Sequence, residues 1–361
     1  MKRIEVAAAI FRRNGRIFLC RRGEGGSCAL LWEFPGGKLE AGETPEECLK
    51  RECREELHVA IEIDGLYDRF DFDYPGKPIR FHFYDARIVS GEPELTEHRE
   101  AKWLWPRELT QYEACPADRE LIEKLAGELP FDHYIWDFDG TLFDSYPQIA
   151  SAVRDAFGDL GCPVTYEEAY ALTKVSVGYA LQTLKERFAL DLTEEELKTR
   201  FREFAQADPC VGSPRPYAGI PDLLKNIVQR GGKHYIYTHR GLSALKYLEA
   251  YSLQNMFADA ITGADGFAPK PAPDAVLALI SRHNMKKGRV VMVGDRDIDI
   301  QAGQNAGAAG CFFDPDHFYG DYPIELMAHS VEELKALLLG DDPIARNIWN
   351  KEEGSLPQGR K

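Results

Sequence analysis

Short apolar strands that alternate with helices constrain the fold of the C-terminal part of this chain more than any other feature. Three such strands lie far apart in the sequence, at residues 134–138, 234–237 and 289–293, and a helical pattern separates each from the next. This alternation is typical of a Rossmann-like, doubly wound parallel sheet. The stretch from about residue 146 to about 215 is helical with little strand signal, which predicts a helical cap inserted after the first strand.

The N-terminal part shows a different pattern of strands and one strongly marked helix. Apolar strands before and after Asn14-Gly15 predict a β-hairpin. Thr44 and Glu47 have the spacing of a capping box, and the helix that they start runs to about Leu57. Strand-like segments near residues 61 and 70 and at 79–89, then a helix at 118–127, complete this part.

Leu129-Pro130 is the boundary that we expect between two domains, because a new buried strand starts directly after it. The sequence therefore predicts an α/β protein with an N-terminal domain at residues 1–129 and a second domain at residues 130–340. A polar tail at residues 341–361 follows them, and we expect it to be loose at its end.

Charge and cysteine usage limit the partners and the compartment. The 361 residues carry a formal net charge of −15, which argues against nucleic acid as a partner. An acidic protein can still bind phosphate when a divalent cation screens the repulsion. The eight cysteines form no CxxC pair, and no signal peptide or run of about 20 apolar residues occurs. We expect a soluble cytoplasmic protein with reduced thiols and small phosphate substrates; the oligomeric state stays open.

Three carboxylates share one face of the helix that begins after Thr44. Glu52, Glu55 and Glu56 lie at positions i, i+3 and i+4. An isolated triplet of this kind is more often a solvated acidic face. Here Gly36-Gly37 precede the helix and allow a close backbone approach, and Arg51 is placed to pair with Glu43. Such an oxygen cluster suits Mg²⁺ or Mn²⁺.

Residues 37–59 resemble the signature of the Nudix hydrolases. The matching positions are Gly37, Glu43, Arg51, Glu52, Cys53, Glu55, Glu56 and Val59, whereas His58 stands where the family has a glycine. That glycine relieves a left-handed helix end, which His tolerates better than most residues. The resemblance implies an α/β/α sandwich with a mixed sheet. It also implies metal roles for Glu52, Glu55, Glu56 and the Gly37 carbonyl, with water attack on a diphosphate.

The resemblance covers roughly residues 1–127 and is closest to the MutT and CTP-pyrophosphohydrolase branch. It implies that Arg22 contacts phosphate and that Glu97, ahead of its competitor Glu100, is a further catalytic or metal residue. Asp118 falls where this branch reads the base, and it could equally be the N-cap of the following helix. The implied reaction converts a nucleoside triphosphate, including oxidised forms such as 8-oxo-dGTP, to a monophosphate and pyrophosphate.

A second set of polar residues follows the strands of the C-terminal sheet. Asp137 and Asp139 come at the end of the first strand, where open α/β sheets bind ligands. One carboxylate of such a pair can be a nucleophile and the other a proton donor. Further candidates are Thr238, which ends another strand, Lys270 between two prolines, and the carboxylates Asp295 and Asp299.

This set resembles the motifs of the haloacid dehalogenase superfamily over about residues 131–338. The resemblance implies Asp137 as nucleophile, Asp139 as acid and base, Thr238 and Lys270 as phosphate ligands, and Mg²⁺ at Asp137, Asp139, Asp295 and Asp299. The helical insert resembles the C1-type cap of phosphoglycolate phosphatase relatives. Arg240 and His239 either contact the substrate or belong to a helix N-terminus.

The sequence therefore predicts a bifunctional, metal-dependent hydrolase. Its N-terminal half would cleave a nucleoside triphosphate, and its C-terminal half would dephosphorylate a small phosphomonoester through an aspartyl-phosphate. A nucleoside monophosphate and phosphoglycolate are both open as substrates of the second site. Two alternatives are a phosphatase with a regulatory, nucleotide-binding N-terminal domain and a phosphomutase.

Overall fold

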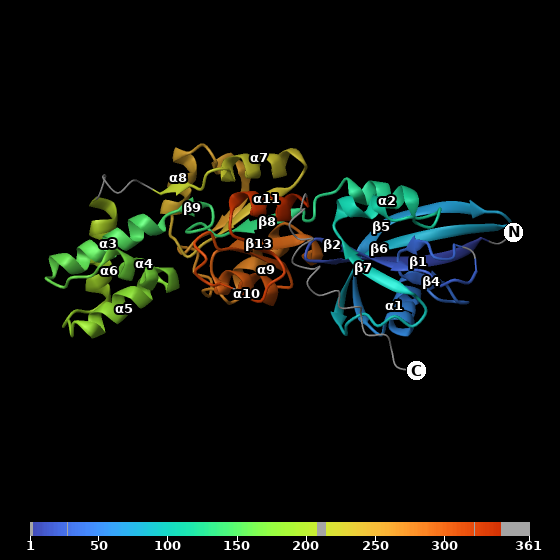
Figure 1. The fold of residues 1–361 in the computed structure, drawn as a ribbon, viewed down its shortest axis with the longest axis horizontal. Coiled ribbons are helices and arrows are strands. Elements are labelled where there is room, and N and C mark those ends of the chain that lie inside the picture. The colour runs from blue at the N-terminus through green and yellow to red at the C-terminus, as the bar shows by residue number, and fades with distance from the viewer. Residues whose placement is uncertain (1–2, 27, 208–213, 321, 341–361) are drawn as a thin grey trace.

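The molecule is elongated, with three lobes in a row (Figure 1). The computed structural model describes residues 3–26, 28–207, 214–320 and 322–340. The N-terminal domain lies at one end, the parallel sheet in the middle and the helical cap at the other end. The tail predicted at residues 341–361 lies outside the described residues.

A mixed sheet forms the N-terminal domain. Strand β1 (Ile4–Arg13) runs antiparallel to β2 (Arg16–Arg21) and β4 (Gly36–Lys38), and parallel to β6 (Lys77–Ser90). Strands β3 (Trp32–Glu33) and β7 (Glu100–Leu104) pair with β2. The segments expected near residues 61 and 70 are one long strand, β5 (Ala60–Tyr74), which pairs with β6 through three register shifts. The bulges bend β5 without ending it, which the sequence pattern did not reveal.

Alternate side chains of β1 pack against two different helices. Ala7, Ala9 and Phe11 lie in one apolar cluster with helix α1 (Pro45–Leu57). Ala8 and Ile10 lie in another cluster with helix α2 (Arg119–Ala126). Because successive side chains of a strand point to opposite faces, this division produces a three-layer α/β/α sandwich. The 3-10 helix Pro106–Gln111 links β7 to the α2 side of the sheet.

The predicted signals at both ends of α1 are present. Thr44 accepts a hydrogen bond from the Glu47 amide, and the Glu47 carboxylate accepts one from the Thr44 amide at 2.9 Å. His58 ends the helix in the left-handed conformation, with φ 56° and ψ 30°. Asn14 and Gly15 both have positive φ at the turn between β1 and β2, as a tight hairpin requires.

Six parallel strands form the middle lobe. They are β8 (His133–Trp136), β11 (Lys233–Tyr237), β12 (Phe257–Ile261), β13 (Val290–Gly294), β14 (Ala309–Phe313) and β15 (Met327–Ala328). Their order is β12-β11-β8-β13-β14-β15, and each pair is parallel. The prediction of a doubly wound parallel sheet is confirmed.

Helices cover both faces of this sheet. Tyr134 and Trp136 pack into the apolar cluster of α7 (Ile220–Gln229), α8 (Ser243–Ala250) and α11 (Val331–Leu339), whereas Ile135 packs into that of α9 (Asp274–Arg282) and α10 (Asp297–Asn305). Strand β8 is thus buried on both faces. This burial explains its continuous apolar sequence.

Within the residues that the structure describes, the cap is a lobe of four helices with its own core. Its helices are α3 (Tyr146–Asp159), α4 (Tyr166–Val175), α5 (Val177–Arg187) and α6 (Glu194–Ala207). The chain enters the cap through β9 (Phe143–Asp144) and leaves it through β10 (Arg215–Pro216), and these two short strands pair antiparallel. The two connections to the sheet domain therefore run side by side.

Charged residues and one tryptophan join the N-terminal domain to the middle lobe. Trp105 is buried in the same cluster as residues of β8 and α11. Lys286 Nζ lies 2.7 Å from Asp85, and Arg289 Nη1 lies 3.2 Å from Glu128. A cavity of about 370 Å³ at this junction contains none of the predicted site residues.

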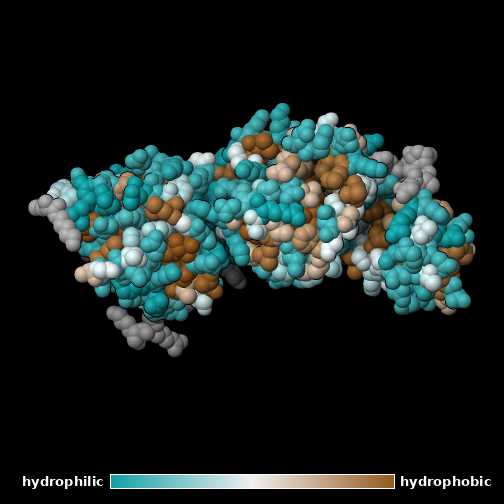
Figure 2. All heavy atoms as spheres, turned by 180° about the vertical axis from the view of Figure 1, so that it is seen from behind, coloured by the Kyte–Doolittle hydropathy of each residue, from teal (hydrophilic) through white to brown (hydrophobic). Residues whose placement is uncertain are grey.

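The face of the molecule that is hidden in Figure 1 is mostly hydrophilic, and its hydrophobic residues form separate groups (Figure 2). Within the described residues, none of the helices is both long enough and apolar enough to cross a membrane.

Candidate active sites

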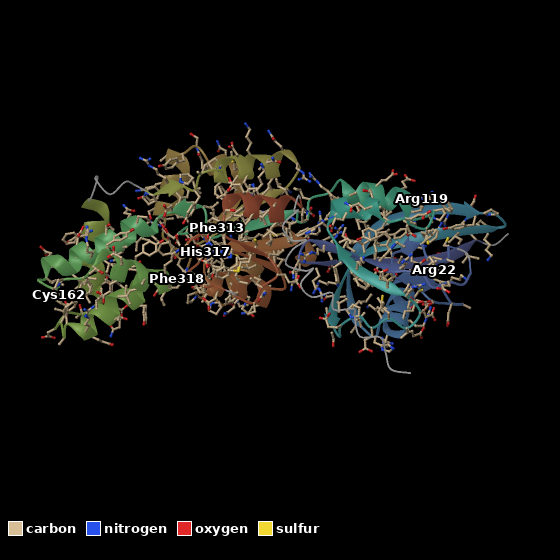
Figure 3. All side chains as sticks on the ribbon, viewed as in Figure 1. Arg22, Arg119, Cys162, Phe313, His317 and Phe318 are labelled. Carbon is tan, nitrogen blue, oxygen red and sulfur yellow. The ribbon has the colours of Figure 1, made fainter. Side chains whose placement is uncertain are left out.

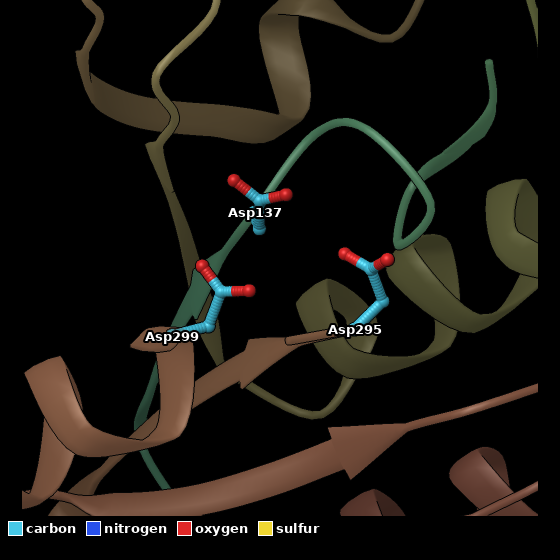
Figure 4. Close-up of side chains that lie close together, drawn as sticks. All are labelled: Asp137, Asp295 and Asp299. Carbon is cyan, nitrogen blue, oxygen red and sulfur yellow. The ribbon is translucent and has the colours of Figure 1, made fainter. Parts of the chain in front are cut away.

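Three aspartates converge at the carboxyl ends of β8 and β13 (Figure 4). Asp137 follows β8 directly, Asp295 follows β13, and Asp299 lies in the first turn of α10. Each offers an oxygen atom within 4.8 Å of those of the other two, and all three side chains are buried. Among the residues that the structure describes, no other group of three carboxylates, thiols or imidazoles is this close.

Lys270 lies between two of these aspartates. Its Nζ is 2.6 Å from Asp137 Oδ1 and 2.6 Å from Asp299 Oδ1. Burial nevertheless raises the pKa of Asp137 to about 7, although Lys270 opposes the shift. The lysine alone therefore does not offset the cost of burying three carboxylates together.

Asp295 is the group that most clearly fits a metal. Both of its carboxylate oxygens are buried and neither has a hydrogen bond of good geometry, with Lys174 Nζ 3.7 Å from Oδ2. Burial raises the pKa of Asp295 to about 6. Buried acceptors without hydrogen bonds are costly, and a divalent cation bound by carboxylate oxygens removes that cost. The three aspartates thus fit the metal expected from the sequence.

Two glycines leave the space that this cluster occupies. A Cβ atom on Gly140 would lie 2.4 Å from Asp295 Oδ2 and 2.3 Å from the Tyr146 ring. One on Gly294 would lie 2.2 Å from Asp299 Cβ. Gly140 also has φ +73°, so both space and backbone conformation require glycine there.

Asp139 lies outside the group of three and is held by other partners. Its Oδ1 accepts hydrogen bonds from Arg240 Nη2 at 2.6 Å and from Ser145 Oγ at 2.5 Å. Arg240 Nε lies 3.0 Å from both of its oxygens. The Arg240 side chain, which was predicted to contact the substrate, thus binds the carboxylate of Asp139, the predicted acid and base residue.

Thr238 and His239 lie at the same site, on the segment that follows β11 in the sheet domain. Thr238 directly follows β11, is buried, and accepts a hydrogen bond from the Arg240 amide at 3.1 Å. His239 Nε2 accepts one from the Lys270 amide at 2.9 Å. His239 therefore positions the segment that carries Lys270. Nothing in the local sequence indicated this contact, which joins residues 31 positions apart.

Lys174 also reaches this site, from the cap, although no sequence pattern indicated it. It lies near the end of α4, and only 1% of its surface is exposed. Its Nζ is 2.8 Å from Asp316 Oδ2 and 3.7 Å from Asp295 Oδ2. A lysine in a predicted amphipathic helix gives no signal of burial, so only tertiary structure reveals it.

In the N-terminal domain, Arg51 organises the carboxylates of α1. It forms two hydrogen bonds with Glu43, of 2.9 and 3.0 Å, as the spacing predicted. It also donates to Glu52 at 2.9 Å and to Glu55 at 3.2 Å. A Cβ atom on Gly37 would lie 2.2 Å from Glu52 Oε1, so that carboxylate lies directly against the Gly37 backbone.

Glu52 and Glu56 are the partly buried carboxylates of this face, whereas Glu55 is exposed. Burial raises the pKa of Glu56 to about 7; the charges of Glu52 and Glu97 contribute to this shift, and His98 opposes it. Glu97 is therefore close enough to Glu56 for their charges to repel. Glu100 instead pairs with Arg21 and Lys102 on the sheet. A carboxyl group with a raised pKa among other carboxylates fits a cation site, because a bound cation would offset their repulsion.

Arg22, Glu33 and Asp118 lie together beside this face. Arg22 Nη1 donates to both oxygens of Glu33, at 2.7 and 2.8 Å. Figure 3 shows Arg22 within the N-terminal domain. Asp118 is buried and makes no side-chain capping bond with α2. Burial and the Glu33 charge raise its pKa well above the usual range, with Arg22 opposing.

Both halves of the chain thus place clustered carboxylates where a cation and phosphate can bind, which defines the protein as a two-domain hydrolase. Models of known families support each half. The NUDIX domain model matches residues 1–125, and the model of haloacid dehalogenase-like hydrolases matches residues 134–312.

Individual relatives agree with these matches. An 8-oxo-dGTP diphosphatase of Haemophilus influenzae is 44% identical over 35% of this chain and 94% of its own length. A CTP pyrophosphohydrolase of Escherichia coli is 37% identical over 34% of this chain and 91% of its own length. A phosphoglycolate phosphatase of Aquifex aeolicus is 33% identical over 48% of this chain and 80% of its own length. The chain therefore belongs to the Nudix family in its N-terminal part and to the haloacid dehalogenase-like hydrolases in its C-terminal part.

Proposed function

We propose that the N-terminal site hydrolyses a nucleoside triphosphate to a monophosphate and pyrophosphate, and that the C-terminal site dephosphorylates a small phosphomonoester. The aspartate triplet at the ends of β8 and β13 is the observation that carries the phosphatase part. The carboxylates of α1 that Arg51 gathers, Glu52 and Glu55, on the same helix face as Glu56, carry the other part. The similarity to the 8-oxo-dGTP diphosphatase supports an oxidised purine nucleotide as a substrate.

In the C-terminal site, an Asp137 oxygen attacks the phosphorus atom while the bond from phosphorus to the ester oxygen breaks. Asp139, held by Arg240 and Ser145, gives its proton to the departing alkoxide. It then takes a proton from a water molecule whose oxygen attacks the aspartyl-phosphate. Inorganic phosphate leaves, and Asp137 is restored. Thr238 and Lys270 hold the phosphate oxygens, and the Lys270 charge offsets the negative charge that develops on them.

In the N-terminal site, Arg22 binds a phosphate group of the nucleotide and Asp118 reads the base. The burial of Asp118 beside Arg22 and Glu33 supports this role, because its side chain makes no capping hydrogen bond although it stands at the N-cap position of α2. Glu56 or a neighbouring carboxylate removes a proton from the attacking water. A bound Mg²⁺ ion, or Mn²⁺ in the N-terminal site, would neutralise charge on the phosphate oxygens. The residues that would hold it are Glu52, Glu55, Glu56 and the Gly37 carbonyl in the N-terminal site, and Asp137, Asp295 and Asp299 in the C-terminal site.

Two substitutions separate the activities. Asp137→Asn removes the nucleophile, so we expect phosphatase kcat to fall by about 10³-fold or more. Glu56→Gln removes a carboxylate of the first site, so pyrophosphate release from 8-oxo-dGTP or CTP falls by about 10²-fold or more. Each variant of the full chain is assayed with Mg²⁺ for pyrophosphate and for inorganic phosphate.

Each variant serves as the control for the other, because it retains the activity of the untouched site. The assignment of two independent sites is wrong if either substitution abolishes both activities. The relatives that match the N-terminal part and those that match the C-terminal part are both named as enzymes, which does not favour a purely regulatory N-terminal domain.

A further inference from the structure

The cavity between the N-terminal domain and the middle lobe has no part in either proposed reaction. Its volume is about 370 Å³, and residues of both lobes line it. Arg12, Tyr67 and Asp85 come from strands of the N-terminal sheet. Lys286 and Arg289 come from the segment just before β13. A ligand in this cavity would therefore contact both domains at once.

Basic side chains outnumber acidic ones around this cavity. The basic residues are Arg12, Arg230, Lys286 and Arg289, and the acidic residues are Asp85, Glu128 and Asp132. The lining thus has a small excess of positive charge, in a protein whose formal net charge is −15. Because a cleft with an excess of one sign attracts ions of the other, the cavity favours an anion.

The two carboxylates that come from the N-terminal domain already accept a hydrogen bond at each oxygen. Asp85 accepts one from Arg12 Nε at 3.1 Å and one from Lys286 Nζ at 2.7 Å. Glu128 accepts one from the Tyr67 hydroxyl at 2.7 Å and one from Arg12 Nη2 at 3.0 Å. A cation in the cavity would therefore have to compete with donors that are already bound.

The basic side chains have more donors than these carboxylates use. Arg289 binds both oxygens of Asp132, yet its Nη1 is buried and makes no hydrogen bond, although Glu128 Oε2 lies 3.2 Å away. An ammonium group has three donors. That of Lys286 donates one hydrogen bond, to Asp85, and 41% of the Lys286 side chain is exposed. A ligand in the cavity can therefore reach N–H donors at Lys286, and it must itself be an acceptor.

The chemistry and the size of the cavity indicate the kind of anion. A phosphate group has several strongly accepting oxygens and a charge of about −2, and it binds ammonium and guanidinium groups through charge-assisted hydrogen bonds. A single water molecule needs about 30 Å³, so the cavity is also large enough for two linked phosphate groups. Both proposed reactions release anions of this kind.

We propose that the cavity at the domain junction binds a small phosphate anion, either inorganic phosphate or pyrophosphate. Lys286 contacts the anion directly, and the more enclosed Arg12 and Arg289 add positive charge near it. The site goes beyond the proposed function, because none of the proposed catalytic residues lines the cavity. An anion held by both domains would stabilise the folded two-domain arrangement, since it binds the folded chain only.

Calorimetry with pyrophosphate and with inorganic phosphate tests the proposal on the full chain. The buffer is freed of divalent cations with a chelating resin, so that metal-dependent binding at the two proposed active sites is absent. We expect one anion to bind per chain. Lys286→Met should weaken this binding by about 10-fold or more, because a charge-assisted hydrogen bond is lost. The anion that binds more tightly identifies the ligand.

Lys287→Met is the matched control. Lys287 is the next residue, but its side chain lies beside Gly307 and does not line the cavity. Both variants should keep both basal activities, and Asp85 keeps its bond to Arg12 when Lys286 is replaced. Thermal unfolding gives a second measurement: the preferred anion should raise the midpoint of the wild type and of Lys287→Met, and raise that of Lys286→Met much less.

Arg230→Met is a second variant, from a different side of the cavity, in case Lys286→Met does not fold. It should also weaken the binding of the anion.

Four outcomes overturn the proposal. The wild type does not bind either anion without divalent cations, or it binds acetate as tightly as phosphate. Lys286→Met and Arg230→Met both bind as tightly as the wild type, which would place the anion elsewhere. Lys287→Met loses as much affinity as Lys286→Met, which would show a general effect of net charge.

Discussion

At the scale of single residues, the surroundings of an ionisable group decide what it can do. Glu43 lies at the surface with 14% of its side chain exposed, and its hydrogen bonds with Arg51 lower its pKa to about 2. Asp137 is fully buried among other carboxylates, and its pKa is raised to about 7. The two groups differ little in intrinsic acidity. Glu43 therefore serves to orient Arg51, whereas Asp137 sits in a cluster that a cation can complete.

His234 provides a test of this effect away from both sites. Its Nδ1 accepts a hydrogen bond from Trp136 at 3.0 Å, and its Nε2 donates to the Leu224 carbonyl at 3.0 Å. The rings around it, those of Tyr134, Trp136 and Phe257, are uncharged. Burial lowers the pKa of His234 to about 4.

The unfolded chain therefore binds a proton at His234 below about pH 6.5, whereas the folded chain binds it only near pH 4. The contribution of neutral His234 to the free energy of unfolding is therefore fully present at neutral pH, and it is lost as the pH drops through this range. Between about pH 7 and about pH 5 we expect a loss of about 2 kcal/mol from this residue. Urea unfolding of the wild type and of His234→Gln at both pH values measures it. The same pH-dependent loss in both proteins would contradict the assignment.

At the scale of elements, the end of α1 shows how one residue sets local geometry. His58 adopts φ 56°, a conformation in which most L-residues are strained and glycine is not. The Nudix pattern has glycine at this position, and the structure shows that His58 keeps the same left-handed turn. The departure from the pattern therefore leaves the carboxylate face of α1 in place.

Substitutions at position 58 test this reading of the helix end. We expect His58→Gly to raise the free energy of unfolding by about 0.5 kcal/mol, since the positive φ no longer costs energy. His58→Val should lower it by about 1 kcal/mol, because a β-branched residue is strained there. Urea denaturation at neutral pH measures both. Shifts in the same direction would show that the left-handed turn does not limit stability.

At the scale of the whole molecule, the junction couples the two halves of the chain. Trp105 of the N-terminal domain is buried within the core cluster of the parallel sheet. Arg289, at the start of β13, pairs with Asp132 and with Glu128 across the junction. Strand β8 starts beside the junction, and its carboxyl end, which carries Asp137, leads through β9 into the cap. A product of one site must therefore leave it before it can reach the other.

Arg289→Met tests whether the junction couples the unfolding of the two domains. Removing one partner of a buried ion pair costs about 3–5 kcal/mol, and we expect about 2 kcal/mol because the Asp132 side chain is half exposed. Thermal unfolding by calorimetry should change from one transition towards two. Arg80→Met is the control, since Arg80 pairs with Asp71 on an exposed face and should cost less than about 1 kcal/mol. Equal effects of the two substitutions on thermal unfolding would show that the junction does not couple the unfolding of the two domains.

The sequence by itself determined many of the local elements and the groups that lie at their ends, but not that β5 is one continuous strand. The hairpin turn at Asn14-Gly15, the capping box at Thr44 and the pairing of Arg51 with Glu43 are local, so spacing reveals them. The proximity of Asp137 and Asp295 could also be predicted from the sequence, because the carboxyl ends of parallel strands meet at one edge of a sheet.

Only the tertiary structure decided contacts between residues that are distant in sequence. It joined Arg240 to Asp139, His239 to the Lys270 segment, and Lys174 of the cap to the aspartate cluster. A helical pattern reports which residues share one face but not what that face meets. The sequence therefore showed the chemistry of each half, whereas the fold decided which charges surround it.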